Sequence, residues 1–502
     1  MTPSTGPGRP PGRPPGGPPG GPPGSAAGSA AWELLLPAAS APARARGRAL
    51  QGALRDAVRS GRLAVGTRLP SSRNLAADLG VSRGLVTEAY EQLTAEGYLR
   101  SGQGAGTWVG DAVRAARPRA RDLAPRSSGD LADFVPGTPD LSLFPRSAWA
   151  AAQRSVLAGL PHESLGYPDP RGLPGLRTAL AELLARRRGV VADPERIMVV
   201  SGVAQATSLL ASVLHARGTR TAGVEDPGSP QHHALYAAAG LGTVPLPLDD
   251  EGLATGPLYG TGVRLVVTTP AHQFPTGIAY SARRRAELLD WARSVDGLVL
   301  EDDYDGDFRY DRAPVGALQG LDPERVAYTG SVSKSLAPGL RLGWLLVPDW
   351  LADAVVERKR TTDLGHPTLD QALFARFVER GDYDRQLRVC QRAYRERRDA
   401  LVASLAEHFP GSRVTGIAAG LHAIATLPKR YGPEEGFLAR VTKAGVAVRP
   451  LTAYAHGGAD GAGGEPVGDG PVAGQEVRLV LGYAHLTPAR IRAGVARMAR
   501  AV

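Results

Sequence analysis

The chain has 502 residues, 43% of them hydrophobic and 22% charged, and a formal net charge of +10. This length exceeds what one hydrophobic core usually supports, so we expect more than one domain. No apolar run is long enough to span a membrane, the N-terminus lacks the apolar stretch of a secretory signal, and the single cysteine excludes a disulfide framework, which together indicate a cytoplasmic protein.

Most of the excess positive charge lies in the first quarter of the chain. Residues 1–130 carry 17 arginines against 9 acidic residues, whereas the remainder carries 42 basic residues against 40 acidic ones. Residues 1–30 are rich in proline and glycine and predict a disordered tail, and residues 111–130 predict a basic linker. A basic leading segment on a near-neutral body indicates a module that binds a polyanion.

Residues 31–110 show the pattern of a small helical domain. Apolar residues recur at helical spacing over 50–58, residues 72–79 predict a second short helix, and Ser82 can cap a third. A glycine-rich hairpin is expected around residues 102–106. Three helices followed by a hairpin predict a winged helix-turn-helix.

Four motifs in this stretch resemble the GntR-type winged helix: Leu69-Pro-Ser-Ser-Arg-Asn-Leu-Ala, Leu79-Gly-Val-Ser-Arg, Ala89-Tyr-Glu-Gln-Leu and Glu96-Gly-Tyr-Leu. The first turn of the third helix can enter a major groove, where an arginine can bind a guanine or a phosphate. The resemblance implies contacts to double-stranded operator DNA from Arg73, Ser82, Arg83, Thr87, Gln103 and Gly104. The alternative is a winged helix that contacts protein.

The body, residues 131–502, alternates strand and helix patterns. Helical patterns separate most of its short apolar runs, which predicts an α/β fold with an open, mostly parallel sheet and a smaller α+β subdomain from about residue 405 to 502. In such a sheet the ligand lies beyond the carboxyl ends of the strands. The five apolar runs that precede small or polar residues are Ile197–Val200, Ala222–Val224, Leu265–Val267, Leu298–Leu300 and Val326–Tyr328.

One of the four lysines, Lys334, stands where it could hold a cofactor aldehyde. Lysine can form a Schiff base, whereas a guanidinium group stays protonated. In the run Ser331-Val-Ser-Lys334-Ser-Leu-Ala-Pro-Gly-Leu-Arg341 the hydroxyls and the arginine can bind a phosphate. This combination is the outline of a pyridoxal 5'-phosphate (PLP) site.

A PLP site also needs an acid for the pyridine nitrogen, a donor for the ring oxygen and further phosphate donors, and candidates for each follow other predicted strands. Asp302 can pair with the pyridine nitrogen, and Tyr304 can bond the ring oxygen. The run Ser201-Gly-Val-Ala-Gln205 opens a predicted helix, and helix N-terminal amides favour phosphate.

The body resembles fold-type I aminotransferases, and together with the N-terminal module it resembles the MocR/GabR-like regulators. The motifs are Gly137-Thr-Pro-Asp140, Gly166-Tyr-Pro-Asp-Pro-Arg-Gly172, Thr269-Pro-Ala-His-Gln-Phe-Pro-Thr-Gly277 and Glu301-Asp-Asp-Tyr-Asp-Gly-Asp-Phe-Arg-Tyr310. The resemblance implies an aldimine at Lys334 and a homodimer with shared sites, in which Tyr167 reaches the partner's phosphate. The implied cofactor-binding residues are Lys334, Asp302, Tyr304, Ser331, Ser333, Arg341, Val203, Ala204, Tyr167 and His272.

Three positions depart from the usual aminotransferase pattern. Ser229 stands where an aromatic ring stacks on the pyridine, Phe274 replaces an asparagine, and Val480 stands where many relatives hold an arginine for the substrate carboxylate. Arg478 is expected to bind that carboxylate instead. The retained lysine with altered substrate residues favours ligand sensing over turnover.

Two further features are expected to carry no function. His232 and His233 predict a surface pair rather than metal ligands, and no metal site is expected. Lys359 lies in a charged helical run and predicts a solvated helix face.

The sequence thus predicts a PLP-dependent transcriptional regulator that senses PLP, a small amine or an amino acid at Lys334. Two alternatives stay open. One is an active aminotransferase that carries a DNA-binding domain, and the other is a regulator whose PLP pocket is vestigial.

Overall fold

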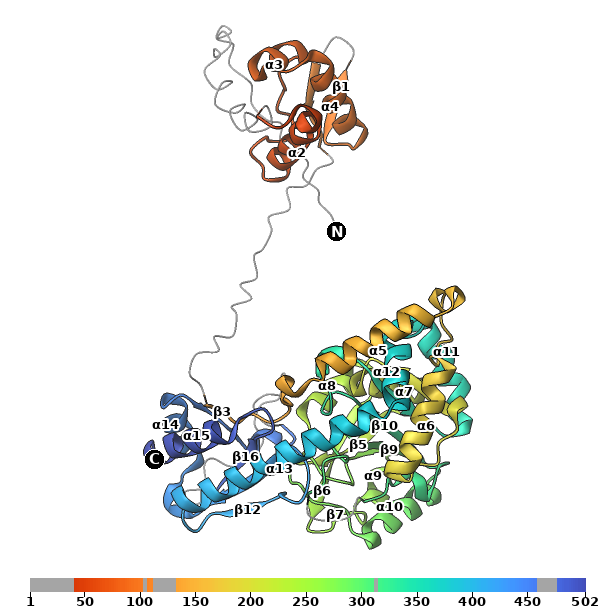
Figure 1. The fold of residues 1–502 in the computed structure, drawn as a ribbon, viewed down its shortest axis with the longest axis vertical. Helices are drawn as coiled ribbons and strands as arrows, with labels where there is room; N and C mark the ends of the chain where they lie inside the picture. The colour runs from red at the N-terminus through yellow and green to blue at the C-terminus, as the bar shows by residue number, and fades with distance from the viewer. Residues whose placement is uncertain (1–39, 103–105, 112–131, 311–314, 458–475) are drawn as a thin grey trace, which may run out of the picture. The chain divides into compact units, whose positions relative to one another are not determined.

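The structure, a computed structural model, describes residues 40–102, 106–111, 132–310, 315–457 and 476–502. The chain divides into two units, Met1–Ser127 and Ser128–Val502, which we describe one at a time (Figure 1). The expected tail at 1–30 and nearly all of the expected linker lie outside the described residues. Within the described ranges, no helix has the length and apolar character needed to cross a membrane.

The N-terminal unit contains helices α2 (Arg46–Arg59), α3 (Ser72–Leu79) and α4 (Arg83–Ala95), followed by an antiparallel hairpin of β1 (Leu99–Gly102) and β2 (Gly106–Val109). The predicted winged helix-turn-helix is therefore confirmed. The apolar residues expected on the inner helix faces are buried in one core: Leu50, Leu54, Ala57, Val58, Val86, Ala89, Tyr90 and Leu93.

Short polar side chains and one glycine set the turn between α3 and α4. Ser71 caps α3, because its hydroxyl accepts the Asn74 N–H at 3.2 Å. Gly80 ends α3 with a φ of +61°, a left-handed conformation that glycine adopts at little cost. Ser82 caps α4 by accepting the Leu85 N–H at 3.3 Å, as the sequence predicted.

The C-terminal unit is built on an eight-stranded sheet in the order β4-β11-β10-β9-β8-β5-β6-β7. Parallel pairing joins β10, β9, β8, β5 and β6, and β11 is antiparallel to both β10 and β4. The five predicted strands therefore run in one direction, and the mostly parallel sheet is confirmed. The bounds are β4 Ile197–Val200, β5 Thr221–Asp226, β6 Gly242–Asp249, β7 Gly252–Leu253, β8 Leu265–Thr268, β9 Leu298–Asp302, β10 Val326–Ser331 and β11 Gly343–Leu346.

Helices cover both faces of this sheet, which explains why its strands are continuously apolar. In β4, Ile197 and Val199 pack into the cluster that holds α6, α12 and α13, whereas Met198 and Val200 pack into the cluster that holds α7, α8 and α11. The helices are α5 Arg146–Gly159, α6 Pro174–Arg188, α7 Val203–Ala216, α8 Pro230–Ala238, α9 Leu258–Thr261, α10 Ala282–Ser294, α11 Asp349–Asp363, α12 Thr368–Glu379 and α13 Asp382–His408.

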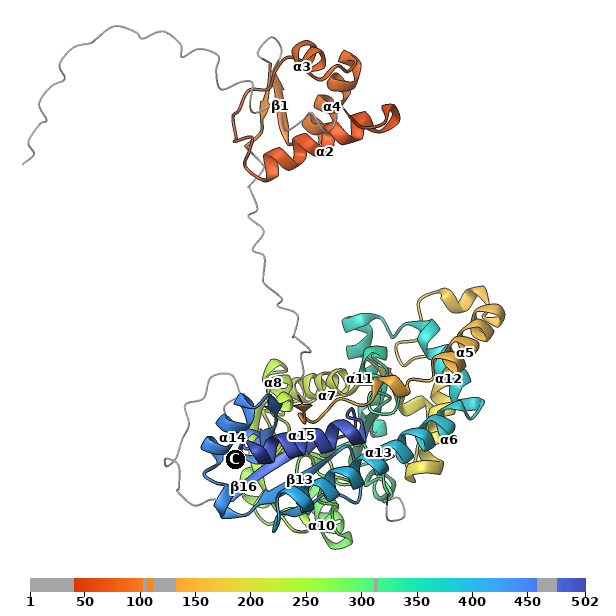
Figure 2. The same cartoon turned by 60° about the vertical axis from the view of Figure 1, so that its left-hand side comes forward.

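A smaller antiparallel sheet in the order β12-β13-β16-β15 forms the C-terminal subdomain. Helix α15 lies alongside the second half of α13 against this sheet (Figures 1 and 2). Strand β3 pairs with β14, so residues 132–133 are held by the same subdomain. The bounds are β3 Ala132–Asp133, β12 Arg413–Thr415, β13 His422–Leu427, α14 Glu434–Lys443, β14 Val446–Ala447, β15 Arg449–Pro450, β16 Val477–Gly482 and α15 Pro488–Arg500.

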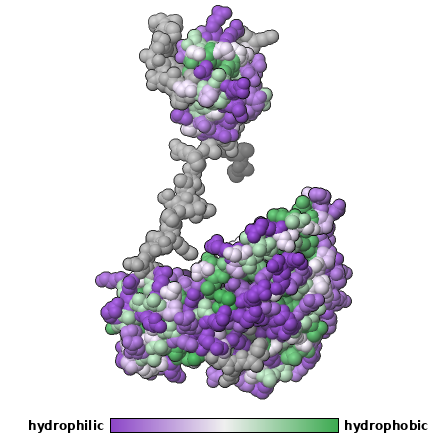
Figure 3. All heavy atoms as spheres, in the orientation of Figure 1, coloured by the Kyte–Doolittle hydropathy of each residue, from purple (hydrophilic) through white to green (hydrophobic). Residues whose placement is uncertain are grey.

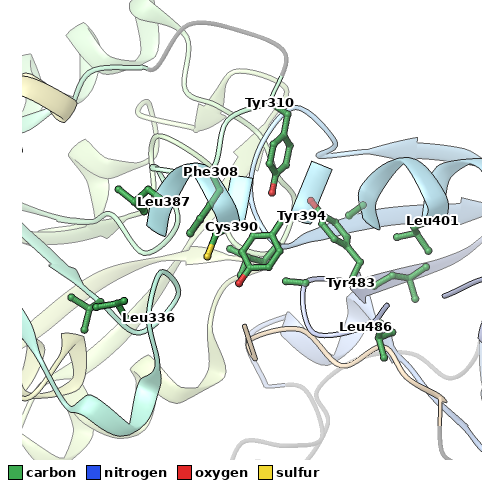
Figure 4. Packing of buried hydrophobic residues seen from close by; sticks show 14 of the residues in the cluster. Phe308, Tyr310, Leu336, Leu387, Cys390, Tyr394, Leu401, Tyr483 and Leu486 are labelled. Atoms are coloured by element: carbon green, nitrogen blue, oxygen red, sulfur yellow. The ribbon is translucent and has the colours of Figure 1, made fainter. Parts of the chain in front are cut away.

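The long helix α13 links the large sheet to the C-terminal subdomain. Its Tyr394 ring packs edge-on against Phe308 at 5.3 Å, and Cys390 is buried beside them (Figure 4). Tyr310 and Tyr483 both donate hydrogen bonds to the Gly420 carbonyl. The outer face of α13 carries many charged side chains and lies within the hydrophilic band that crosses this unit in Figure 3.

Candidate cofactor site and DNA-binding surface

A cavity of about 1380 Å³ lies at the carboxyl ends of the parallel strands. It brings together eight of the ten predicted cofactor-binding residues: Val203, Ala204, Asp302, Tyr304, Ser331, Ser333, Lys334 and Arg341. They come from the ends of β4, β9 and β10, which run in the same direction and therefore end at one edge of the sheet. Tyr167 and His272 do not line this cavity.

Lys334 follows β10, and its ammonium group lies inside the cavity. Its Nζ donates a hydrogen bond to the Gly137 carbonyl oxygen at 2.5 Å. Burial lowers the pKa of Lys334, although the nearby carboxyl groups of Asp305 and Asp302 oppose the shift. A lowered pKa increases the fraction of neutral amine, which is the form that attacks an aldehyde.

Asp302, the last residue of β9, is buried and incompletely bonded. Only 6% of the residue is exposed, and burial, together with the Asp303 charge, raises its pKa to about 8. Its Oδ1 is buried and has no hydrogen-bond partner within the part of the chain that the structure describes. A protonated pyridine nitrogen is the donor that this oxygen lacks, so the site fits the ring of PLP.

The other end of the cavity is suited to a phosphate. Gly202 precedes the N-terminus of α7, and Arg341 donates to the Ser201 carbonyl oxygen. Gly202 has a φ of +88°, and a Cβ there would lie 3.3 Å from the Arg341 guanidinium. The α7 amides, the Ser331 and Ser333 hydroxyls and this guanidinium form the kind of donor set that a phosphate requires.

An ion pair with a buried lysine lies behind this phosphate end. Ser201 donates its N–H to Gln205 Oε1 at 2.7 Å, and Gln205 Nε2 donates to Asp363 at 2.5 Å. Lys359 Nζ lies 2.8 Å from the same carboxylate, and the Lys359 side chain is 0% exposed. The prediction of a solvated Lys359 is therefore wrong, because α11 packs against α7 and buries this side chain.

His272 contacts Tyr304, which lines the cavity, but does not itself line it. The Tyr304 hydroxyl lies 3.1 Å from His272 Nδ1, which is also 2.8 Å from Asp305 Oδ2. Burial raises the pKa of Tyr304 well above its usual value, so the phenol keeps its proton and can donate. His422 packs against His272 with ring centroids 5.2 Å apart, and its Nε2 lies 3.0 Å from the Pro275 carbonyl oxygen. His272, held by Asp305, therefore supports the Tyr304 hydroxyl.

The prediction of a surface pair at 232–233 is also wrong. His232, one helical turn after Ser229, lines the cavity with its Nε2 3.6 Å from Asp302 Oδ2. Burial lowers the pKa of His232 to about 4, so the ring is neutral at pH 7. His233 packs edge-on against His456 at 4.7 Å. Residues from α8 and from the segment after β15 thus close this side of the cavity.

The structure does not place Arg478 in the cavity. Arg478 is exposed on β16, where it pairs with Thr426 of β13. Sequence reasoning missed Arg449, which lines the cavity and lies directly opposite Val480 across the β15–β16 pair. No signal along the chain indicates that pairing, because β15 is only two residues long.

In the N-terminal unit, the predicted DNA-contacting residues gather near the start of α3 and α4. Arg73, Ser82 and Arg83 are exposed, and Thr87 is half-buried with its hydroxyl bonded to the Arg83 carbonyl at 3.0 Å. No other described residues of this unit cover Ser82 and Arg83 at the start of α4. The remaining predicted residues, Gln103 and Gly104, lie outside the described residues.

Two family models match the chain. The model described as aminotransferase class I and II matches residues 137–460, and the model described as bacterial regulatory proteins, gntR family, matches residues 47–109. The two matches correspond to the cavity-bearing unit and to the winged helix.

Individual proteins and solved structures are also similar to the chain. The probable rhizopine catabolism regulatory protein MocR of Rhizobium meliloti is 37% identical, over 70% of this chain and 75% of the relative. The HTH-type pyridoxine biosynthesis transcriptional regulator PdxR of Corynebacterium glutamicum is 33% identical, over 80% and 87%. The solved structure of Pyrococcus horikoshii kynurenine aminotransferase in complex with PMP is 26% identical with a TM-score of 0.64, over 74% of this chain and 91% of that one.

Proposed function

The chain belongs to the MocR-like transcriptional regulators, PLP-dependent proteins that join a GntR-type DNA-binding domain to an aminotransferase-like domain, and we propose that it senses an amine through Lys334. The single observation that carries this proposal is that one cavity holds the Lys334 amine and an Asp302 oxygen that has no hydrogen-bond partner among the described residues. When bound, PLP supplies an electrophilic aldehyde carbon and an electron-withdrawing ring.

We propose a role for the residues at each end of the cofactor. Lys334 Nζ would hold the aldehyde end, and Asp302, supported by His232, would hold the pyridine nitrogen. Tyr304, whose proton is retained by burial and whose hydroxyl is oriented by His272, would donate to the ring oxygen.

We also propose a regulatory step in which the ligand changes the affinity for operator DNA. A ligand shifts a conformational equilibrium only if it binds the two states with different affinity. The cavity is lined both by the large sheet and by the C-terminal subdomain, which contributes His422, Arg449 and Tyr454. A ligand that fills the cavity therefore touches both parts, and their relative placement becomes sensitive to it.

A homodimer with shared sites is part of the proposal. Tyr167 is 92% exposed, yet its loop is fixed by the Asp169–Arg171 ion pair at 2.8 Å and by the Leu173 N–H, which donates to Gln371 at 2.7 Å. An exposed aromatic side chain on a fixed loop is typical of a contact with another subunit. Two winged helices in a dimer would bind two half-sites of one operator.

The test is the absorption spectrum of the full chain with added PLP, before and after borohydride reduction, followed by peptide mapping. We expect a visible band that borohydride abolishes as it fixes the cofactor onto the peptide holding Lys334, and Lys334→Ala should lack the band while keeping its circular dichroism spectrum. A colourless protein that still selects sequences from a randomised pool of double-stranded DNA would contradict sensing at Lys334. Sustained product formation from amino donors and keto acids would instead favour an active aminotransferase.

A further inference from the structure

Two histidines and a carboxylate come together beside the cofactor cavity. Among the described residues, His272, Asp305 and His422 form a group whose ligand atoms all lie within 4.8 Å of one another. His272 follows β8, Asp305 follows β9, and His422 is the first residue of β13 in the C-terminal subdomain. All three residues are buried. The group contains neither of the adjacent histidines, His232 and His233, that the sequence singled out.

The hydrogen bonding of His422 resembles that of a histidine that binds a metal. Its Nε2 lies 3.0 Å from the Pro275 carbonyl oxygen and must donate to it, because a carbonyl oxygen can only accept. The other ring nitrogen, Nδ1, therefore keeps its lone pair, and no described residue forms a hydrogen bond with it. Metal-binding histidines typically donate their second N–H to a carbonyl or carboxylate, which fixes the ring and its tautomer.

His272 can adopt the same arrangement. Its Nδ1 lies 2.8 Å from Asp305 Oδ2, and its Nε2 lies 3.4 Å from the Gly416 carbonyl oxygen. A metal ion at Nδ1 would replace the proton that His272 shares with Asp305. Its Nε2 would then carry the proton and donate it to the Gly416 carbonyl, as His422 does to its own carbonyl partner.

The spacing and the charge of the group suit a small divalent ion. A tetrahedral Zn²⁺ with bonds of about 2.0–2.2 Å holds its ligand atoms about 3.3 Å apart. The separations in the group, from 2.8 Å to at most 4.8 Å, bracket this value. Burial lowers the pKa of His422 to about 3, so its ring is neutral at pH 7 and able to bind a metal. His422 and Tyr304 line the cavity, which gives an ion a path to the group.

We propose that His272, Asp305 and His422 bind a divalent transition-metal ion such as Zn²⁺ at the edge of the cofactor cavity. Two imidazoles and one carboxylate suit Zn²⁺, whereas Mg²⁺ and Ca²⁺ prefer ligand sets made of oxygen alone.

The bound ion is expected to oppose the cofactor through Tyr304. The Tyr304 hydroxyl lies 3.1 Å from His272 Nδ1, so it is placed to become a fourth ligand as a phenolate, with its proton released to solvent. A metal-bound Tyr304 has no proton to donate to the ring oxygen of PLP. Zinc and PLP should therefore weaken each other's binding, a consequence that rests on the donor role proposed for Tyr304.

Calorimetric titration of the untagged, PLP-free full chain with ZnCl₂ and with MgCl₂ tests the site. We expect one Zn²⁺ per chain and no binding of Mg²⁺. His422→Gln and Asp305→Asn should each weaken zinc binding at least about 100-fold, because changing residues that only support a ligand already costs about 10- to 100-fold. Circular dichroism spectra show whether each variant is folded.

His233→Gln is the matched control, because His233 also lines the cavity but lies outside the group. It should bind zinc as the unsubstituted chain does. Absence of zinc binding in the unsubstituted chain, full zinc affinity in both His422→Gln and Asp305→Asn, or its loss in His233→Gln would each overturn the site.

Titration of the visible band with PLP, without zinc and in saturating zinc, tests the opposition. We expect zinc to lower the affinity for PLP at least about fivefold, the effect of one lost hydrogen bond, and bound PLP to lower the affinity for zinc by the same factor. In His422→Gln zinc should not change the affinity for PLP, which controls for complexes of zinc with PLP in solution.

The two titrations separate this inference from sensing at Lys334. If zinc binds to the group but leaves the affinity for PLP unchanged, the link through Tyr304 is refuted and the metal site stands. If zinc does not bind, the site is refuted while the visible band at Lys334 still tests the proposed function. Failure of amine sensing would leave the zinc titrations of the PLP-free chain unaffected.

Discussion

At the scale of single residues, Asp302 is a buried carboxyl group that lacks a hydrogen bond. Its Oδ1 is buried without a partner in the described part of the chain, and leaving a buried polar atom unbonded costs about 1–3 kcal/mol. Its Oδ2 lies near His232, which is held neutral by burial. The Oδ1 atom can therefore accept a hydrogen bond from a positively charged donor, and a protonated pyridine nitrogen is such a donor.

We predict that Asp302→Asn weakens PLP binding about 10- to 100-fold, because a neutral amide replaces the charged partner of the pyridine nitrogen in a buried place. Equilibrium titration of the visible band with PLP measures this loss. Asp290→Asn, which changes a carboxylate that is 69% exposed on α10, should bind PLP as the unsubstituted chain does. Equal affinities in both variants would remove Asp302 from the cofactor site.

The same residue predicts a pH dependence of stability without the cofactor. Burial raises the pKa of Asp302 to about 8, whereas an aspartate in an unfolded chain titrates near 4. Between these values the folded chain holds a proton that the unfolded chain has released, so this contribution to stability is lost as the pH rises through about 8. The groups that face Asp302 are Asp303, Lys334, Asp305 and Glu225, with His232 neutral beside it.

Urea unfolding of the PLP-free chain at pH 6 and pH 8 checks this sign. The unsubstituted chain should lose more stability across this range than Asp302→Asn, by up to about 2.7 kcal/mol for one proton linked over two pH units. Comparing the two proteins cancels the titration of the other groups. A larger loss in Asp302→Asn would refute the raised pKa.

At the scale of elements, the start of α7 determines how a phosphate can be held. Gly202 has a φ of +88°, which few other residues adopt, and it leaves room for the Arg341 guanidinium. We predict that Gly202→Ala weakens binding of PLP at least about tenfold, because the added Cβ strains the backbone and pushes the guanidinium away. Binding of pyridoxal, which has no phosphate, should change much less.

Absorption titrations with PLP and with pyridoxal distinguish these effects. Gly175→Ala provides the matched control, because a Cβ at this position in α6 meets nothing within 4 Å. If Gly202→Ala reduces the affinities for PLP and pyridoxal by the same factor, the defect lies outside the phosphate end.

Elements whose pattern is local could be predicted from the sequence, and those that depend on distant pairing could not. Strands β4, β5, β8, β9 and β10 were predicted because continuous apolar runs end in polar residues, and parallel strands bring those ends to one edge. Strand β6 was missed because Pro245 and Pro247 interrupt its pattern. It tolerates them because β5 pairs along one side, while β7 pairs only with its last residues.

The site residues that the sequence did not predict also depend on contacts between distant segments. His232 enters the cavity because α8 packs beside Asp302, and Lys359 is covered because α11 packs against α7. Arg449 depends on the register of a two-residue strand with β16. Each position is fixed by packing between segments far apart in the chain, which residue types and spacing alone do not determine.

At the scale of the whole molecule, the dimer can be tested through the trans contact expected of Tyr167. Its side chain is 92% exposed in one chain, and the hydroxyl is expected to reach the phosphate bound by the partner. We predict that Tyr167→Phe lowers the affinity for PLP by about 5- to 10-fold, the effect of one lost hydrogen bond, while Lys334→Ala gives no visible band.

Hybrid dimers of these two variants decide whether the contact is made between subunits. If Tyr167 acts on the partner's site, one site of each hybrid carries both substitutions and the other carries neither, so half of the sites should bind PLP with unsubstituted affinity. If Tyr167 acts on its own chain's site, each site carries one substitution and none regains that affinity. Differently tagged chains allow the hybrid to be purified, and titration of its visible band gives the number and affinity of the intact sites. Because both variants are defective alone, recovered affinity in the hybrid can arise only from a site built by two chains.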